Sequence, residues 1–182
     1  LETTRAYALE KLAESGEGDE AARRHAEFFR DLAAREGELQ STPENLARFV
    51  REIDNVRAAL DWAFSPTGDP AIGVALTAAF VPVWFHLELM IECRERTERA
   101  LDSFDPDARL NAPLQMQLYI ALGVGLTFTM GPVDRTRMVL ARALEIAESL
   151  DDVDAQLRLA GIVTLEAANR FIADRKSTRL NS

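Results

Sequence analysis

Residues 121–152, "ALGVGLTFTMGPVDRTRMVLARALEIAESLDD", contain the pattern that decides the fold. An uncharged stretch ends at Met130, Gly131 and Pro132 provide a turn signal, and a charged segment follows. In the charged segment, apolar residues recur at the three- and four-residue spacing of one helix face. They are Val139, Leu140, Ala143, Leu144, Ala147 and Leu150. The stretch therefore predicts two helices joined by a short turn.

The same order of segments occurs earlier in the chain. An uncharged run over 71–87 precedes the charged stretch "ECRERTERALDSF" at 92–104, and Leu101 and Leu144 lie 43 residues apart in similar motifs. "LRLAGIVTLEAANRFI", at 157–172, reads as the start of another pair. No alternating strand pattern of useful length occurs, so the sequence predicts an all-α fold. Since each hairpin can cover a face that its neighbour leaves exposed, the repetition favours an α-solenoid.

Three glycines lie inside predicted apolar helices, at Gly123, Gly125 and Gly161. Because glycine has no Cβ, two helix backbones can approach closely at such positions. The alternative is that these glycines only lower helix propensity and have no role in the repeat.

The two uncharged runs, 71–87 and 112–133, also raise the alternative of a membrane span. The first is at the short limit of a span and contains Pro82, and the second contains glutamines and three glycines. A helix buried on most sides, kinked near Pro82 in the first run, explains both patterns. We therefore expect no membrane segment.

Composition limits the classes of partner and the compartment. The 182 residues include 21 Lys and Arg against 30 Asp and Glu, a net charge of −9, which disfavours binding to a nucleic-acid backbone. The single cysteine, Cys93, excludes an internal disulfide and suits a reducing compartment. The first residues lack the layout of a signal peptide. The expected location is the cytoplasm.

Residues 121–152 resemble a tetratricopeptide-type helical hairpin. Gly131 stands at the turn and Thr136 at a small position of the second helix. Its packing stripe is formed by Leu140, Ala143 and Leu144. Gly123 falls about one residue out of register, and Tyr119 stands where the motif has a tryptophan. The resemblance implies a right-handed α-solenoid of antiparallel helical hairpins.

A longer resemblance covers roughly residues 1–173. "RRHAEFF", "EIDNVRAALDWA" and "GDPAIGVALTAAFVPVWF" are similar to the start of the helical superhelix in bacterial signal-transduction ATPases of the STAND or NB-ARC type. Many members are LuxR-type or antibiotic-regulator-type transcriptional regulators. The resemblance implies that the chain is a fragment, and that a nucleotide-binding module precedes it.

We divide the chain on this basis into four parts. Residues 1–16 are expected to be the end of a winged-helix region or a linker helix, and 17–66 the first helical hairpin. Residues 67–173 are expected to form tetratricopeptide-like hairpins. Residues 174–182 resemble a non-native polar tail, with an ordinary polar terminus as the alternative.

The sequence offers no catalytic or cofactor motif. It lacks the glycine-rich pattern with lysine that a P-loop requires. His25, His86 and Cys93 are too scattered to predict a metal site, and the acidic run at 151–154 lacks the glycine and distal glutamate of a calcium loop. We expect no enzyme activity, no cofactor and no metal.

Two hypotheses of function remain. In the first, the chain is a non-catalytic sensor or scaffold that binds a protein, a peptide or a small effector and regulates an ATPase switch. Trp84 and Tyr119 are candidate groove residues, although both also fit a core. In the second, a stand-alone helical bundle encloses a small ligand in a pocket near His86.

Overall fold

The computed structural model describes residues 7, 11–12, 16–38, 43–103, 112–131 and 134–164. Every regular element in these ranges is a helix, which confirms the predicted all-α class. The chain forms two compact units, residues 1–83 and 84–182. The predicted tail at 174–182 and most of the predicted linker at 1–16 lie outside the described residues.

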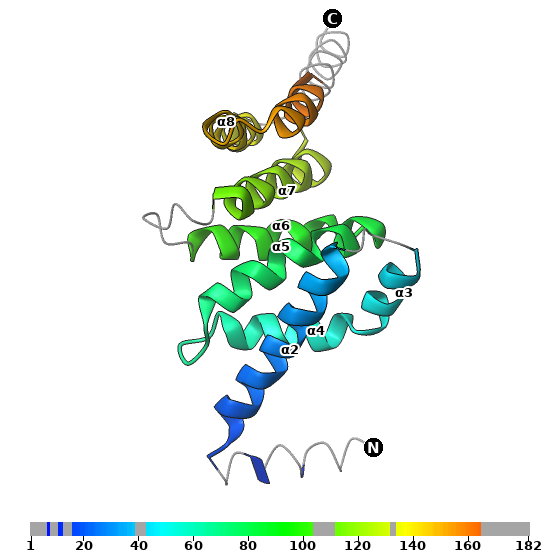
Figure 1. Ribbon diagram of the computed structural model, residues 1–182, viewed down its shortest axis with the longest axis vertical. Coiled ribbons are helices and arrows are strands. Elements are labelled where there is room, and N and C mark those ends of the chain that lie inside the picture. The colour runs from blue at the N-terminus through cyan, green and yellow to red at the C-terminus, as the bar shows by residue number, and fades with distance from the viewer. Residues whose placement is uncertain are drawn as a thin grey trace, which may run out of the picture. The chain divides into compact units, whose positions relative to one another are not determined.

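The first unit contains α2 (Gly18–Glu38), α3 (Pro43–Arg51), α4 (Ile53–Ala63) and most of α5 (Pro70–His86). Helix α2 packs against α4, and α3 contacts α4 (Figure 1). The facing positions are small or apolar and buried. They include Ala26, Phe29 and Ala33 of α2 and Val56, Leu60 and Ala63 of α4. The i, i+4, i+7 spacing on α4 places its apolar stripe on one side of the helix.

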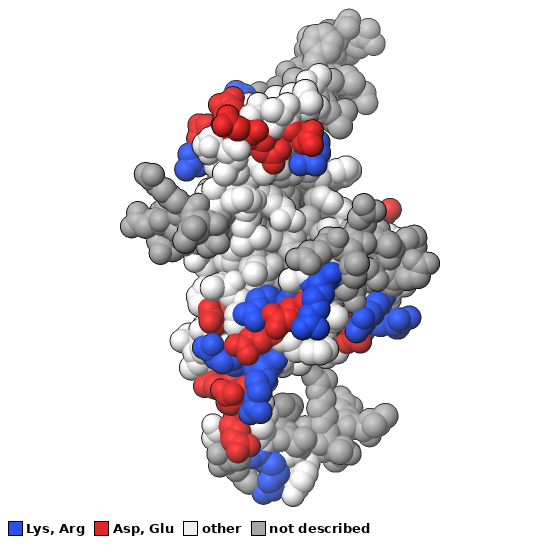
Figure 2. All heavy atoms as spheres, viewed as in Figure 1, with Lys and Arg blue, Asp and Glu red and all other residues white. Residues whose placement is uncertain are grey.

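The exposed side of α2 carries charges of both signs. Figure 2 shows acidic and basic side chains alternating along this helix. Arg24 lies 3.3 Å from Glu20, and Arg30 lies 2.7 Å from Asp31. Such exposed pairs contribute little to stability. Positive and negative side chains are therefore mixed along the described part of this face.

The turn between α4 and α5 is tied to the first turns of α2. The hydroxyl of Thr67 donates a hydrogen bond to Asp19 at 3.0 Å. Arg23 lies 3.5 Å from Asp69 and 5.8 Å from the ring centre of Trp62, within cation–π range. The Thr67–Asp19 and Arg23–Asp69 contacts join residues almost fifty positions apart and tie the start of α5 to α2.

The second unit contains α6 (Met90–Asp102), α7 (Ala112–Met130), α8 (Asp134–Ser149) and a helical segment at 153–164. Helix α7 packs against both α6 and α8 and lies between them in Figure 1. This explains why α7 is apolar around its whole circumference. Within the described residues, no helix combines the length and apolarity needed to cross a membrane.

Two glycines bring α7 close to its neighbours. A Cβ on Gly123 would overlap the side chain of Leu140 in α8, and one on Gly125 would lie 3.2 Å from the Cβ of Arg94 in α6. Close approach was also expected at Gly161, but no described atom lies within 4 Å of a Cβ built there. Gly161 is exposed, so among the described residues no neighbouring helix packs against it.

The burial pattern of α6 returns in α8. Three residues of α6 are fully buried, and so are the three residues of α8 that lie 43 positions later. They are Cys93, Thr97 and Ala100 in α6, and Thr136, Leu140 and Ala143 in α8. Helix α7 runs antiparallel to α6, since Arg94 near the start of α6 donates to Thr129 near the end of α7. The second unit therefore contains successive helices of equivalent environment.

The contrast between Gly123 and Gly161 can be tested by alanine substitution. We expect Gly123→Ala to lower the free energy of unfolding by about 1–3 kcal/mol, because the new methyl group overpacks against Leu140. Gly161→Ala is the matched control and should raise it by up to about 1 kcal/mol through helix propensity. Urea denaturation measures both. Equal effects at the two sites would contradict the packing difference.

Candidate binding groove

A two-bond cap ends α5 beside the candidate groove. The Leu89 N–H donates to the Trp84 carbonyl at 2.9 Å, and the Glu88 N–H donates to the Phe85 carbonyl at 3.2 Å. This is the Schellman arrangement, in which the residue after the helix takes a left-handed conformation. That residue is Glu88, with φ of +56°. Glycine is favoured at such a position, so a glutamate there stores backbone strain.

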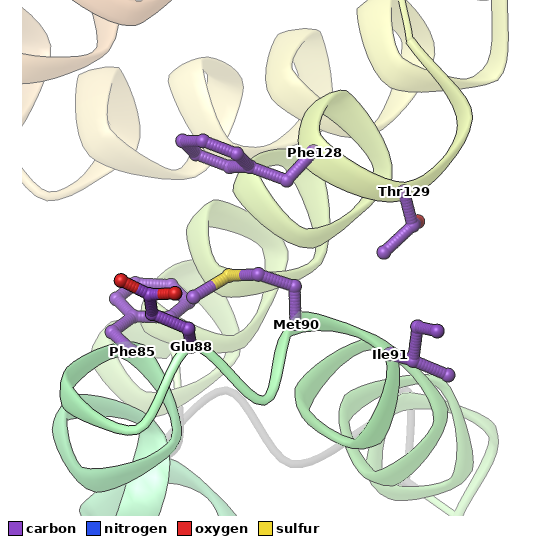
Figure 3. A pocket seen from close by; sticks show the side chains of 6 residues that line it. All are labelled: Phe85, Glu88, Met90, Ile91, Phe128 and Thr129. Atoms are coloured by element: carbon purple, nitrogen blue, oxygen red, sulfur yellow. The ribbon is translucent and has the colours of Figure 1, made fainter.

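A groove of about 730 Å³ opens next to this turn (Figure 3). It is lined by residues from the end of α5, the turn, the start of α6 and the end of α7. These residues are Phe85, Glu88, Met90, Ile91, Phe128 and Thr129. Ile91 is 59% exposed and Phe128 is 73% exposed, so the groove is open to solvent. Antiparallel packing of α6 and α7 brings the two walls together.

The polar groups of the groove have different partners. The Thr129 hydroxyl donates to the Gly125 carbonyl at 2.8 Å and accepts a bond from Arg94 at 3.1 Å. Arg94 also lies 3.6 Å from Glu95. Glu88 is the one charged residue among the six that line the groove, and its side chain is exposed. The groove thus combines an apolar surface with one accessible carboxylate.

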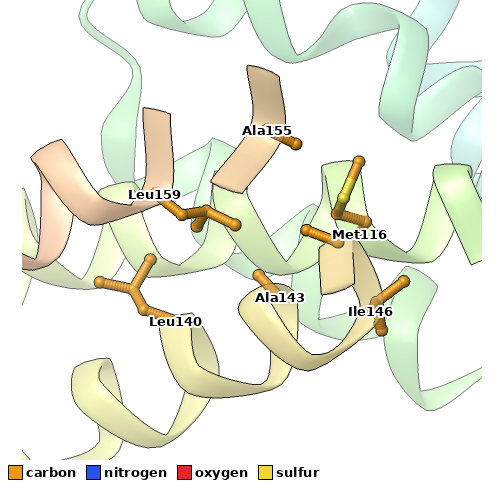
Figure 4. Packing of buried hydrophobic residues seen from close by; sticks show 7 residues of the cluster. Met116, Leu140, Ala143, Ile146, Ala155 and Leu159 are labelled. Atoms are coloured by element: carbon orange, nitrogen blue, oxygen red, sulfur yellow. The ribbon is translucent and has the colours of Figure 1, made fainter. Parts of the chain in front are cut away.

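The predicted repeat-packing residues gather between α7, α8 and the 153–164 helix. Gly131 forms the turn with φ of +75°, and Gly123 packs on Leu140. Thr136, Leu140 and Ala143 are buried, and Leu144 is half-buried against the same cluster. Figure 4 shows Leu140 and Ala143 facing residues from the neighbouring helices. These residues hold helices together and do not line the groove.

The predicted ligand-facing residues lie elsewhere. Trp84 is 1% exposed, so it does not line the groove, and the core alternative that the sequence also allowed is the correct one. Tyr119 is half-buried and packs against the α7–α8 cluster. His86 is exposed at the end of α5, which removes the enclosed pocket that the second hypothesis placed around it. The open groove lies near the expected segments but uses other side chains.

Cys93 is enclosed in α6 and lacks the features of a reactive thiol. It is fully buried, and the Thr97 hydroxyl donates to the Cys93 carbonyl at 2.5 Å. Burial raises the pKa of the Cys93 thiol to about 11, with a further contribution from the nearby charge of Glu92. A neutral buried thiol is a poor nucleophile and a poor metal ligand.

Comparison with known proteins identifies relatives over part of the chain. Over 90 residues the chain is 41% identical to proteins named as predicted HTH-type transcriptional regulators from Mycobacterium tuberculosis and Mycobacterium bovis. The aligned region covers 47% of this chain and 10% of each relative, so the chain spans a small part of their length. No protein-family model matches the chain. No solved structure matches it either.

The strain at Glu88 can be measured against a second site of the same kind. Asp151, with φ of +55°, ends α8 with the same two-bond cap. We expect Glu88→Gly and Asp151→Gly each to raise the free energy of unfolding by about 1 kcal/mol, because glycine adopts this conformation without strain. Chemical denaturation checks this. Destabilisation by either change would show that the side chain makes a contact that outweighs the strain.

Burial of Cys93 predicts slow modification and an alkaline loss of stability. A disulfide reagent at pH 8 should modify Cys93 only on unfolding, while a Cys93→Ala, Met138→Cys variant should react at once, since position 138 is 72% exposed. The pKa of the Cys93 thiol is higher in the folded state than in the unfolded state, so protonation of this thiol favours the folded state. This contribution to the free energy of unfolding is complete below the ordinary thiol pKa of 9.0 and is lost as the pH rises through about 11.

The size of this loss is up to about 3 kcal/mol. Urea denaturation between pH 7.5 and pH 11 should show a steeper decline for the native chain than for Cys93→Ala. Parallel declines would show that Cys93 ionises as easily in the folded state as in the unfolded one.

Proposed function

We propose that this chain is a non-catalytic helical-repeat segment of a transcriptional regulator, and that it binds a protein, peptide or small effector in the groove beside Glu88. The similarity to regulators over 90 residues supports the regulatory role. The single structural observation behind the binding role is the groove itself. It leaves Ile91 and Phe128 largely exposed, and large exposed apolar residues around a depression are typical of binding surfaces.

The repeat supports a right-handed solenoid with tetratricopeptide-like hairpins as part of the proposal. The first helices of successive pairs, α5, α7 and the helix at 153–164, begin 42 and 41 residues apart. This spacing is longer than the 34 residues of a standard tetratricopeptide repeat. The chain therefore fits a tetratricopeptide-like architecture only with longer helices or turns.

The chemistry of the groove favours an apolar ligand that carries a positive charge. Phe85, Met90 and Phe128 offer apolar contact, and Glu88 offers a carboxylate at the edge. A peptide with an apolar side chain next to Lys or Arg satisfies both. A small organic amine is the second candidate, since the groove volume lies in the range of small-molecule sites.

Within a longer regulator, this segment would act on modules that lie outside the matched region. The relatives are far longer than the matched region, which leaves room for DNA-binding and ATPase modules outside it. Binding in the groove would then bias an ATPase switch in the cytoplasm, by favouring one arrangement of the helices over another. The net charge of −9 and the mixed charges of α2 support a segment that does not itself bind nucleic acid. Among the described residues, no group of three His, Cys, Asp or Glu side chains is placed to hold a metal ion.

Selection from a displayed library of short random peptides tests the groove. We expect enrichment of peptides that combine apolar residues with Lys or Arg, and at least tenfold weaker binding of these peptides to Phe128→Asp. Glu88→Gln should reduce the preference for basic residues while apolar binding persists. Met138→Asp is the matched control, because Met138 is as exposed as Phe128 but does not line the groove.

The outcomes separate the two candidates. If peptides fail to enrich but small organic amines bind in a Phe128-dependent manner, the effector is a small molecule. Peptides that bind Phe128→Asp and Met138→Asp equally well would show that the groove is not the binding site.

A further inference from the structure

The helix at 153–164 has two contrasting faces. Ala155 and Leu159 are fully buried in the cluster that also contains Leu140 of α8 (Figure 4). On the other side, Val153 is 62% exposed and Leu157 is 68% exposed. An apolar helix with one face buried and an apolar second face in solvent is incompletely covered.

Helix α7 shows what covers the second face of such a helix. The 153–164 helix begins 41 residues after α7, so Leu159 corresponds to Leu118 and Leu157 corresponds to Met116. Leu118 and Leu159 are both fully buried. Met116 is also buried, in the cluster that α7 forms with α8, whereas Leu157 is exposed. The two helices therefore differ at the position that α8 covers in α7.

The neighbouring positions show the same difference. Tyr119 and Ile120 of α7 pack against the cluster on α8, and their equivalents are Ala160 and Gly161. Both Ala160 and Gly161 are exposed, and a Cβ built on Gly161 meets no described atom within 4 Å. The exposed face of the 153–164 helix is thus the face with which α7 holds the second helix of its own hairpin.

We propose that Val153, Leu157, Ala160 and Gly161 form the docking surface for the second helix of a further hairpin, joined to the 153–164 helix in the same polypeptide. The chemistry of that helix follows from α8. It carries small or branched residues at i, i+4, i+7 and i+11, with charged residues on its outer side. In α8 these are Thr136, Leu140, Ala143 and Ala147, all at most 1% exposed.

A second copy of the chain does not supply this helix. The stripe of α8 that would dock is already buried within its own hairpin, so it is not available to another molecule without unfolding. Small residues at Ala160 and Gly161 allow close approach of the incoming backbone, as Gly123 does at Leu140. This surface is distinct from the groove beside Glu88, and the inference does not depend on what that groove binds.

An extended chain tests the inference. Residues 175–182 are replaced by a copy of residues 134–152, which places the copy 41 residues after α8. We expect amide hydrogen exchange in the 153–164 helix to slow at least tenfold relative to the original chain. Adding Leu157→Glu to the extended chain should abolish the slowing, because a carboxylate cannot be buried there without a partner. The same change in the original chain should have little effect, since Leu157 is already exposed.

A control extension carries glutamate at the positions of the copy that match Leu140 and Ala143, and it should give no slowing. Unchanged exchange in the extended chain would overturn the inference. Slowing that survives Leu157→Glu would also overturn it, because the copy would then have displaced α8 or bound elsewhere. Concentration-dependent dimerisation of the original chain that Leu157→Glu abolishes would identify a second copy as the occupant instead.

Discussion

Helix α7 sets the arrangement of the second unit because it is apolar on all sides. A helix of this kind is stable in water only when both of its faces are covered. Helix α6 covers one face and α8 the other, and the absence of a Cβ at Gly123 and Gly125 brings both neighbours close. The amphipathic helices can keep charged residues in solvent because they contact α7 with one stripe only. The groove follows from the same arrangement, since the end of α7 must lie beside the start of α6.

The groove draws its character from a conflict between local preference and helix packing. Two backbone hydrogen bonds close the turn that ends α5, and this cap requires a residue in the left-handed conformation. Glutamate at that position is unfavourable for the backbone but gives the groove its charge. Local strain of this kind often coincides with binding sites, where chemistry outweighs stability. The walls of the groove also expose large apolar side chains to solvent, and this exposure supports the proposed binding role as well.

Sequence patterns identified the helices well where periodicity and turn signals agreed. The stripe of α8 and the turn at Gly131 were visible because helix spacing and glycine chemistry have local causes. The exposure of His86 was not, because a residue near a helix end can face either way and only packing decides. For Trp84 the sequence left both a groove and the core open, and its burial decides for the core. Glu88 was missed since a glutamate gives no signal for a left-handed cap. Phe128 was missed because its place in an uncharged run is that of a core residue.

The clamp between the α4–α5 turn and α2 has a consequence for folding. Most helix–helix contacts among the described residues join helices that are neighbours in sequence, which allows fast local assembly. The Thr67–Asp19 and Arg23–Asp69 contacts are different, because they close a loop of nearly fifty residues across the first unit. Loop closure of that length costs entropy before any contact forms. The first unit should therefore acquire its final structure in a later, more cooperative step, while the helices of the second unit can add one after another.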